Sequence, residues 1–112
     1  MTNTSVIRLN GRTYVLSLTT SASAALLIEP KANDQTNYVH LLNTGTGVAA
    51  IELSSGATFV DPAIASSGSA GSYVLPAAMN FPLVIAAPAG PFYIKGISSG
   101  TNVLYITPAL AD

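Results

Sequence analysis

Strand, turn and strand follow one another in Phe92-Tyr93-Ile94-Lys95-Gly96-Ile97-Ser98-Ser99-Gly100-Thr101-Asn102-Val103-Leu104-Tyr105-Ile106-Thr107. Two runs of β-branched, aromatic and aliphatic residues, 92–97 and 102–107, flank a compact Ser/Gly turn sequence, which is typical of two strands joined by a turn. A third such run, 82–87, precedes the turn sequence Pro88-Ala89-Gly90-Pro91. The pattern predicts that these three strands form an antiparallel meander.

Two hairpins are predicted earlier in the chain. Asn10-Gly11 lies between the β-rich runs 6–9 and 12–18, and both turn residues tolerate the positive φ angles of a type I′ turn. The glycine-containing loop 44–47 divides the run 38–53 into two strand-like halves, which indicates the second hairpin.

Short apolar runs predict further strands at 24–28, 57–60 and 72–76. At 24–28 a short helix is the alternative, because alanine and leucine are good helix formers. Residues 31–36 are predicted to form a polar loop. The low-complexity stretch 63–72, rich in Ser, Gly and Ala, predicts a flexible loop or an arm.

The length of 112 residues indicates one domain, 1–112, because it is near the common size of a single domain. Eight or nine short strands at about ten-residue spacing, without a convincing amphipathic helix, predict an all-β fold: an antiparallel two-sheet β-sandwich or a barrel. Nine large apolar side chains are assigned to the core: Val15, Leu27, Leu41, Ile51, Phe59, Val74, Ile85, Ile94 and Ile106.

Charged residues make up only 8% of the chain and hydrophobic residues 49%, whereas an average soluble protein has roughly 25% charged residues. Ser, Thr, Ala, Gly and Asn must therefore cover most of the exterior. Such a surface can be buried against another protein without removing water from charges. The alternative is a monomer whose surface is merely rich in Ser and Thr.

The net charge of −1 and the absence of cysteine exclude several classes of partner and site. No basic patch is available for nucleic acid or anionic lipid. No disulfide or thiolate metal site can form. The most apolar region, 81–94, is interrupted by Pro82, Pro88, Gly90 and Pro91, so it is not expected to span a membrane.

The chain has few residues that could carry acid–base chemistry. Its one histidine, His40, is flanked by Val39 and Leu41, and its five acidic residues are spread singly. A general base near pH 7 is usually a histidine or a perturbed carboxylate, so we expect no enzyme, no catalytic residue and no cofactor. No cluster has metal-ligand spacing, and calcium held by loop carbonyls with Asp34 or Asp61 stays open.

Two motif matches fail on their context. Residues 96–100 match the G-x-S-x-G nucleophile elbow, which requires a following helix and a downstream histidine. Residues 45–50 match the G-x-G-x-x-A dinucleotide fingerprint, which requires a helix N-terminus. Neither helix is predicted, so both stretches are interpreted as hairpin turns. The aromatic residues are likewise interpreted as core or sheet-face residues, with a sugar-stacking platform as the alternative.

The chain resembles the head decoration, or cement, proteins of tailed bacteriophages. Three stretches carry the resemblance: 38–53, 74–83 and 92–107. It implies a jelly-roll-like sandwich that binds the outside of a capsid in many copies, often as a homo-oligomer, with the major capsid protein as partner. It also implies location on the virion exterior after synthesis in the host cytoplasm, in agreement with residues 1–8, which lack the features of a secretory signal.

A protein that clamps shell subunits needs exposed edges and arms. The N-terminal arm 1–5 and the loop 63–72 are the candidates, and the predicted interface residues are Thr2, Asn3, Thr4, Ser66, Ser67, Gly68 and Ser69. The alternatives are a receptor- or carbohydrate-binding module of a tail fibre, and a structural component of the tail or neck.

Overall fold

The computed structural model describes residues 7–31, 37–88 and 90–111. These residues form strands and no helix, so the predicted all-β class is confirmed. The strands are β1 (Ile7–Leu9), β2 (Tyr14–Leu18), β3 (Leu26–Ile28), β4 (Asn37–Thr44), β5 (Ala49–Ser54), β6 (Tyr73–Leu75), β7 (Leu83–Ala86), β8 (Phe92–Ser98) and β9 (Asn102–Ala111).

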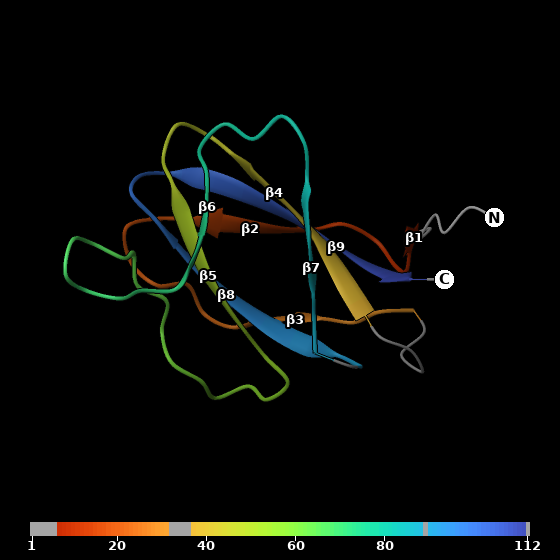
Figure 1. Ribbon diagram of the computed structural model, residues 1–112. Coiled ribbons are helices and arrows are strands. Elements are labelled where there is room, and N and C mark those ends of the chain that lie inside the picture. Colours follow the sequence, from red (N-terminus) through yellow and green to blue (C-terminus); the bar gives the residue numbers. More distant parts are fainter. Residues whose placement is uncertain (1–6, 32–36, 89, 112) are drawn as a thin grey trace.

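The strands form two antiparallel sheets that pack face to face (Figure 1). In sheet A, β1 and β2 both pair with β9, which pairs with β4, which pairs with β7. In sheet B the order is β3-β8-β5-β6. The predicted two-sheet β-sandwich is therefore confirmed.

The order of the strands is that of a jelly roll. β1 and β2 lie on the same side of β9 and count as one interrupted strand, so each sheet has four positions. When β1 and β2 are counted as one strand, β5 and β6 are the only described strands that are consecutive in the chain and pair with each other. Each of the other connections between described strands passes from one sheet to the other. Two four-stranded antiparallel sheets wound in this way define the jelly-roll topology.

The predicted meander and the predicted hairpin at 38–53 are wrong. β7 and β9 lie in sheet A while β8, between them in sequence, lies in sheet B. β4 and β5 are likewise in different sheets. Both predictions assumed that strands joined by a short turn pair with each other, but a short loop can also cross the end of a sandwich.

The predicted hairpin at Asn10-Gly11 is also wrong, because β1 and β2 lie end to end beside β9. Leu9 is opposite Ala109 and Tyr14 is opposite Ile106. The chain therefore advances five residues from β1 to β2 while β9 advances only three. Gly11 has φ of +147°, and a Cβ there would lie 2.9 Å from the Pro108 ring. Asn10 and Gly11 therefore belong to a bulge between β1 and β2 and not to a hairpin turn.

The bulge explains how a proline fits within a central strand. Pro108 accepts a hydrogen bond from Asn10 N at 2.8 Å, so the backbone polar groups of Pro108 face the interruption between β1 and β2. In an antiparallel strand the N and the O of one residue point to the same side. The N–H that proline lacks would therefore face the bulge, where the regular ladder is already broken.

The core lies between the sheets and consists of alternate residues of each strand. Four of the nine predicted core side chains are buried: Leu41, Ile51, Ile94 and Ile106. The assignment of Val15 and Val74 to the core is wrong, because Val15 is 57% exposed on the outer face of sheet A and Val74 is 43% exposed on the outer face of sheet B. Leu27, Phe59 and Ile85 are partly buried. The errors at Val15 and Val74 arise because a shift of one residue in a strand exchanges its faces.

One end of the sandwich is held by two buried asparagines. Asn43 Nδ2 donates to Gly47 O at 3.1 Å and to Pro76 O at 2.9 Å, and Asn102 Nδ2 donates to Asn43 Oδ1 at 3.1 Å. Asn102 also bonds both backbone groups of Gly47. These amides join the loop after β4, the loop after β6 and the start of β9.

The substitution Asn43→Leu should lower the free energy of unfolding by about 3 kcal/mol, because it removes the hydrogen bonds of a fully buried amide to Gly47 and Pro76 and takes one partner from the buried Asn102 amide. Urea denaturation measures the change. The exposed residue Asn80 is the matched control, and Asn80→Leu should change stability by no more than about 0.5 kcal/mol. Equal effects of the two substitutions would contradict the role assigned to Asn43.

Candidate functional site

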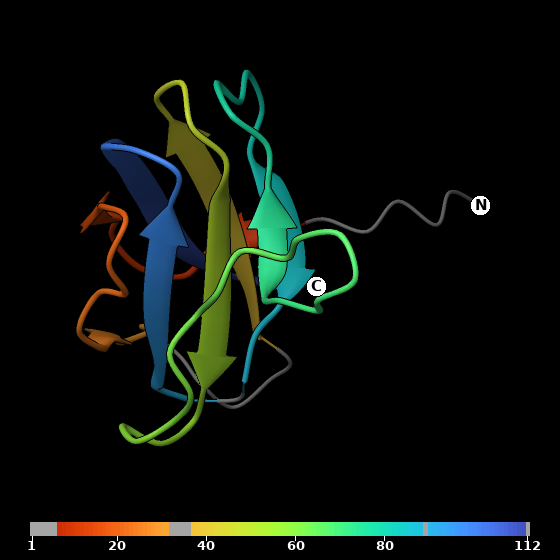
Figure 2. The same ribbon diagram turned by 90° about the vertical axis from the view of Figure 1, so that its left-hand side faces the viewer.

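Part of the outer face of sheet B is covered by the protein's own chain. The connection between β5 and β6, residues 55–72, returns along the outside of the sheet and crosses in front of β5 (Figure 2). Ala50, although it is on the outward-facing side of β5, is completely buried, and Pro62 of the connection is buried as well. The connection therefore covers the part of this face that β5 forms, while Val74 on β6 stays 43% exposed.

Charged side chains of sheet B hold that connection in place. Lys95 Nζ donates to Phe59 O at 2.8 Å and to Asp61 Oδ1 at 3.1 Å, and lies 4.6 Å from the centre of the Phe59 ring. The predicted strand at 57–60 is wrong, because these residues are irregular and are held by the Lys95 side chain instead of a ladder. The outward-facing charge of Lys95 therefore contacts the protein's own connection.

The far end of the connection is fixed by Ser72. Ser72 Oγ donates to Glu52 Oε2 on β5 and accepts from Ala63 N at 3.0 Å, while Ser72 N donates to Ala63 O at 2.7 Å. These bonds close the base of the predicted flexible loop 63–72. Its mobility stays a prediction.

The outer face of sheet A differs in composition. The pairing register and the burial alternation place fifteen described residues on it: Leu9, Thr13, Val15, Ser17, Tyr38, His40, Leu42, Thr44, Pro82, Val84, Ala86, Val103, Tyr105, Thr107 and Ala109. None of these is Asp, Glu, Lys or Arg. We call this surface the outer A face.

Apolar side chains of the outer A face stay accessible. Leu9 is 68% exposed, Val15 is 57% exposed and Tyr105 is 39% exposed. Val15 and Leu42 are opposite Tyr105 on its two neighbouring strands, so the three form a row across the sheet. Such cross-strand neighbours on one face lie about 5 Å apart. The row is a contiguous apolar surface.

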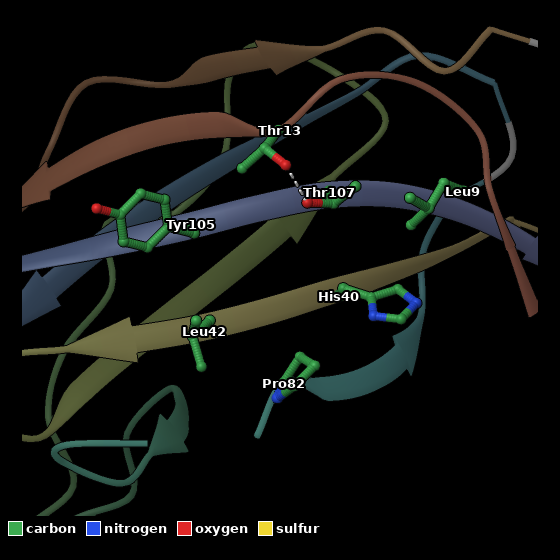
Figure 3. A pocket seen from close by; sticks show the side chains of 7 residues that line it. All are labelled: Leu9, Thr13, His40, Leu42, Pro82, Tyr105 and Thr107. Carbon is green, nitrogen blue, oxygen red and sulfur yellow. Dashed lines mark hydrogen bonds between the residues drawn. The ribbon is translucent and has the colours of Figure 1, made fainter. Parts of the chain in front are cut away.

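A hollow of about 400 Å³ lies in the outer A face. Figure 3 shows its seven lining side chains, which come from β1, β4 and β9, from Thr13 just before β2 and from Pro82 just before β7. Thr13 and Thr107 share a hydrogen bond of 2.7 Å between their hydroxyl groups at this site. The lining is otherwise mainly apolar, with Leu9, Leu42 and Tyr105.

His40 is the most polar group of the hollow. Its Nε2 atom is buried and has no hydrogen-bond partner among the described residues. Among the described residues, no carboxylate lines the hollow beside His40.

None of the six charged residues whose side chains are described belongs to the outer A face, but three of them border a second hollow that Leu9 of this face also lines. Glu52, Asp61 and Lys95 belong to sheet B and its covering connection. Arg12, Glu29 and Lys31 border a second hollow of about 560 Å³ beside β1 and β3. In the part of the chain that the structure describes, no three His, Asp or Glu residues gather at metal-binding distance.

The predicted interface residues lie elsewhere. Ser66, Ser67, Gly68 and Ser69 form an exposed turn in the β5–β6 connection, in which Ser66 and Ser69 exchange backbone hydrogen bonds. Thr2, Asn3 and Thr4, with the predicted arm 1–5, lie outside the described residues. Sequence reasoning missed the outer A face, although the uncharged alternation of Val103, Tyr105 and Thr107 is visible in the sequence.

The comparisons with known proteins leave the function to be argued from these residues. No protein-family model, curated protein or solved structure matches the chain. Among the described residues, no helix has the length and apolar character that crossing a membrane requires.

The substitution Lys95→Met should release the segment 58–65 from sheet B, because it removes the ion pair and the bond to Phe59 O. We expect amide hydrogen exchange in 58–65 to become at least about tenfold faster while β4 and β9 stay protected. Lys31→Met is the control and should leave exchange in this segment unchanged. Unchanged exchange in the Lys95 variant would show that other contacts hold the segment.

Proposed function

We propose that this chain is a structural protein of a tailed-phage virion, which binds the outside of the capsid in many copies and stabilises it. The observation that carries the proposal is the contrast between the two sheet faces. Sheet B is covered over β5 by its own chain and carries the charged residues Glu52 and Lys95, whereas the outer A face combines accessible apolar side chains with the absence of charge among its described residues. Uncharged apolar patches of this kind are typical of surfaces that bind protein.

Two further features support a role in a large particle. The jelly-roll topology is common in viral capsid proteins, although it also occurs in lectins, so the fold agrees with the role without defining it. The low charge of the whole chain lowers the cost of removing water from its surface. On a symmetric shell, weak contacts of many copies add up.

The proposal is tested with capsids that lack the protein. Purified chain is mixed with preformed shells, pelleted with them, and the shells are then heated. We expect saturable co-sedimentation and an increase in the temperature at which the shells open. Absence of binding, together with retention on a defined glycan array, would replace this proposal with the tail-fibre alternative.

The substitution Tyr105→Glu should reduce co-sedimentation with shells at least about tenfold, because it places a charge at the centre of an apolar row that becomes buried. Tyr73→Glu is the matched control, since Tyr73 is 50% exposed on edge strand β6 of sheet B. Circular dichroism verifies that both variants are folded. Equal loss of binding in both variants would contradict the assignment of the outer A face to the contact with the shell.

Removal of residues 66–69 tests the predicted interface turn. Because Ser66 and Ser69 pair with each other, Ala65 and Ala70 approach closely enough to be joined, and the sandwich should keep its thermal midpoint within about 5 °C. We expect shell binding to fall at least about tenfold if this turn contacts the capsid. Full binding by the shortened chain would exclude the turn from the shell interface.

A further inference from the structure

We propose that the second hollow, of about 560 Å³, binds the side-chain carboxylate of an acidic peptide segment. The hollow lies beside the bulge of Asn10 and Gly11, and the cations Arg12 and Lys31 line it together with Tyr14. The structure describes three basic side chains, and two of them line this hollow. Positive charge is therefore concentrated at this place on the described surface.

The backbone that carries the two cations is fixed by hydrogen bonds. Asn10 N donates to Pro108 O at 2.8 Å, and Lys31 N donates to Asn10 O at 2.7 Å. The bulge thus joins β9 to the segment that follows β3. A bulge redirects the side chains beside it and is common next to functional sites. Arg12 follows the bulge directly and Lys31 is bonded to it, so the backbone of both cations is positioned at the hollow before a ligand arrives.

The hydrogen-bond donors of the hollow are available to a ligand. The side chains of Arg12 and Lys31 have no ion pair or hydrogen bond to any residue that the structure describes. Glu29 N donates to Tyr14 Oη at 3.1 Å. Tyr14 Oη is therefore an acceptor toward the backbone and keeps its own proton for another acceptor. A guanidinium, an ammonium and a phenol thus line one hollow, and all three donate to oxygen.

The charges of the hollow favour a ligand with one negative charge. Arg12 and Lys31 carry two positive charges, and Glu29, which also lines the hollow, carries one negative charge. A guanidinium binds a carboxylate through two parallel N–H···O bonds. Glu29 repels a dianion such as phosphate, and it can accept an N–H from the backbone that carries the ligand carboxylate. An acidic side chain within a peptide meets both conditions.

Leu9 connects the second hollow with the outer A face. It lines both this hollow and the hollow of about 400 Å³, and it is 68% exposed. A protein segment that lies on the outer A face can therefore place its next residue in the second hollow. The inference rests on the proposed function for the source of this segment, the shell protein, and requires an acidic side chain beside apolar ones. Such charge complementarity contributes more to specificity than to affinity.

Titration of the isotope-labelled full chain with the peptide acetyl-Gly-Leu-Glu-Leu-Gly-amide, followed by nuclear magnetic resonance, tests the hollow without shells. We expect saturable shifts at Arg12, Tyr14 and Lys31 with a dissociation constant on the order of 1 mM. The same peptide with Gln in place of Glu should bind at least about tenfold more weakly, because it carries no charge. Equal binding of the two peptides overturns the proposal. Inorganic phosphate that binds as tightly as the Glu peptide overturns it as well, since the hollow would then select free anions.

The variants Arg12→Gln and Lys31→Gln test the two cations at exposed positions, where substitution should leave the sandwich folded. The double variant should bind the Glu peptide at least about tenfold more weakly than the wild type. Lys95→Gln is the matched control, because it removes the same charge at sheet B, and it should bind the peptide as the wild type does. Equal loss in the double variant and in the control would assign the effect to net charge and overturn the proposal.

Shell binding, measured with the same variants, distinguishes this inference from the proposed function. A chain that binds the Glu peptide but no shells contradicts the capsid function and leaves the carboxylate site intact. Equal shell binding by the wild type and the double variant contradicts the shell protein as the source of the acidic segment. Loss of both peptide and shell binding in the double variant, with both retained in Lys95→Gln, supports the two proposals together.

Discussion

The hydrogen-bonded pair of buried asparagines, Asn43 and Asn102, is the interaction on which the rest of the sandwich depends. A jelly roll passes its chain repeatedly from one sheet to the other, and at each passage the backbone leaves the ladder that satisfied its polar groups. An asparagine amide both donates and accepts, so it can replace the lost backbone partners. Asn43 and Asn102 do this for Gly47 and Pro76, and thereby hold two crossing loops against the start of β9.

The same topology determines which face is covered. β5 and β6 are the two described consecutive strands that pair within one sheet, and their connection, residues 55–72, returns over the outside of sheet B. Two short connections, β4 to β5 and β8 to β9, lead from one sheet to the other at the end of the sandwich. Connections this short cannot lie over an outer face. The accessibility of the outer A face therefore follows from the winding of the chain together with its composition.

The sequence was sufficient to predict the class of fold and the position of most strands, because these depend on local composition and on turn residues. Strand pairing was not predictable in the same way. Asn10-Gly11 has the ideal residues for a hairpin, yet Pro108 in β9 provides a partner for Asn10 and the pair forms a bulge. The core was half predicted, since Leu41 and Ile106 are buried while Val15 faces outward. The face of a strand depends on its partner strands, which the order of residues does not reveal.

The composition of the outer A face combines two requirements that usually conflict. An accessible apolar surface lowers solubility, and charges, the common remedy, would oppose burial against a partner. Here the row of Val15, Tyr105 and Leu42 adjoins a row in which Thr13 and Thr107 present hydroxyl groups. Hydroxyl groups bind water in the free chain, and their dehydration costs far less than that of ions. A face built in this way therefore combines accessible apolar area with hydroxyl groups that water can bind, and its described residues carry no charge.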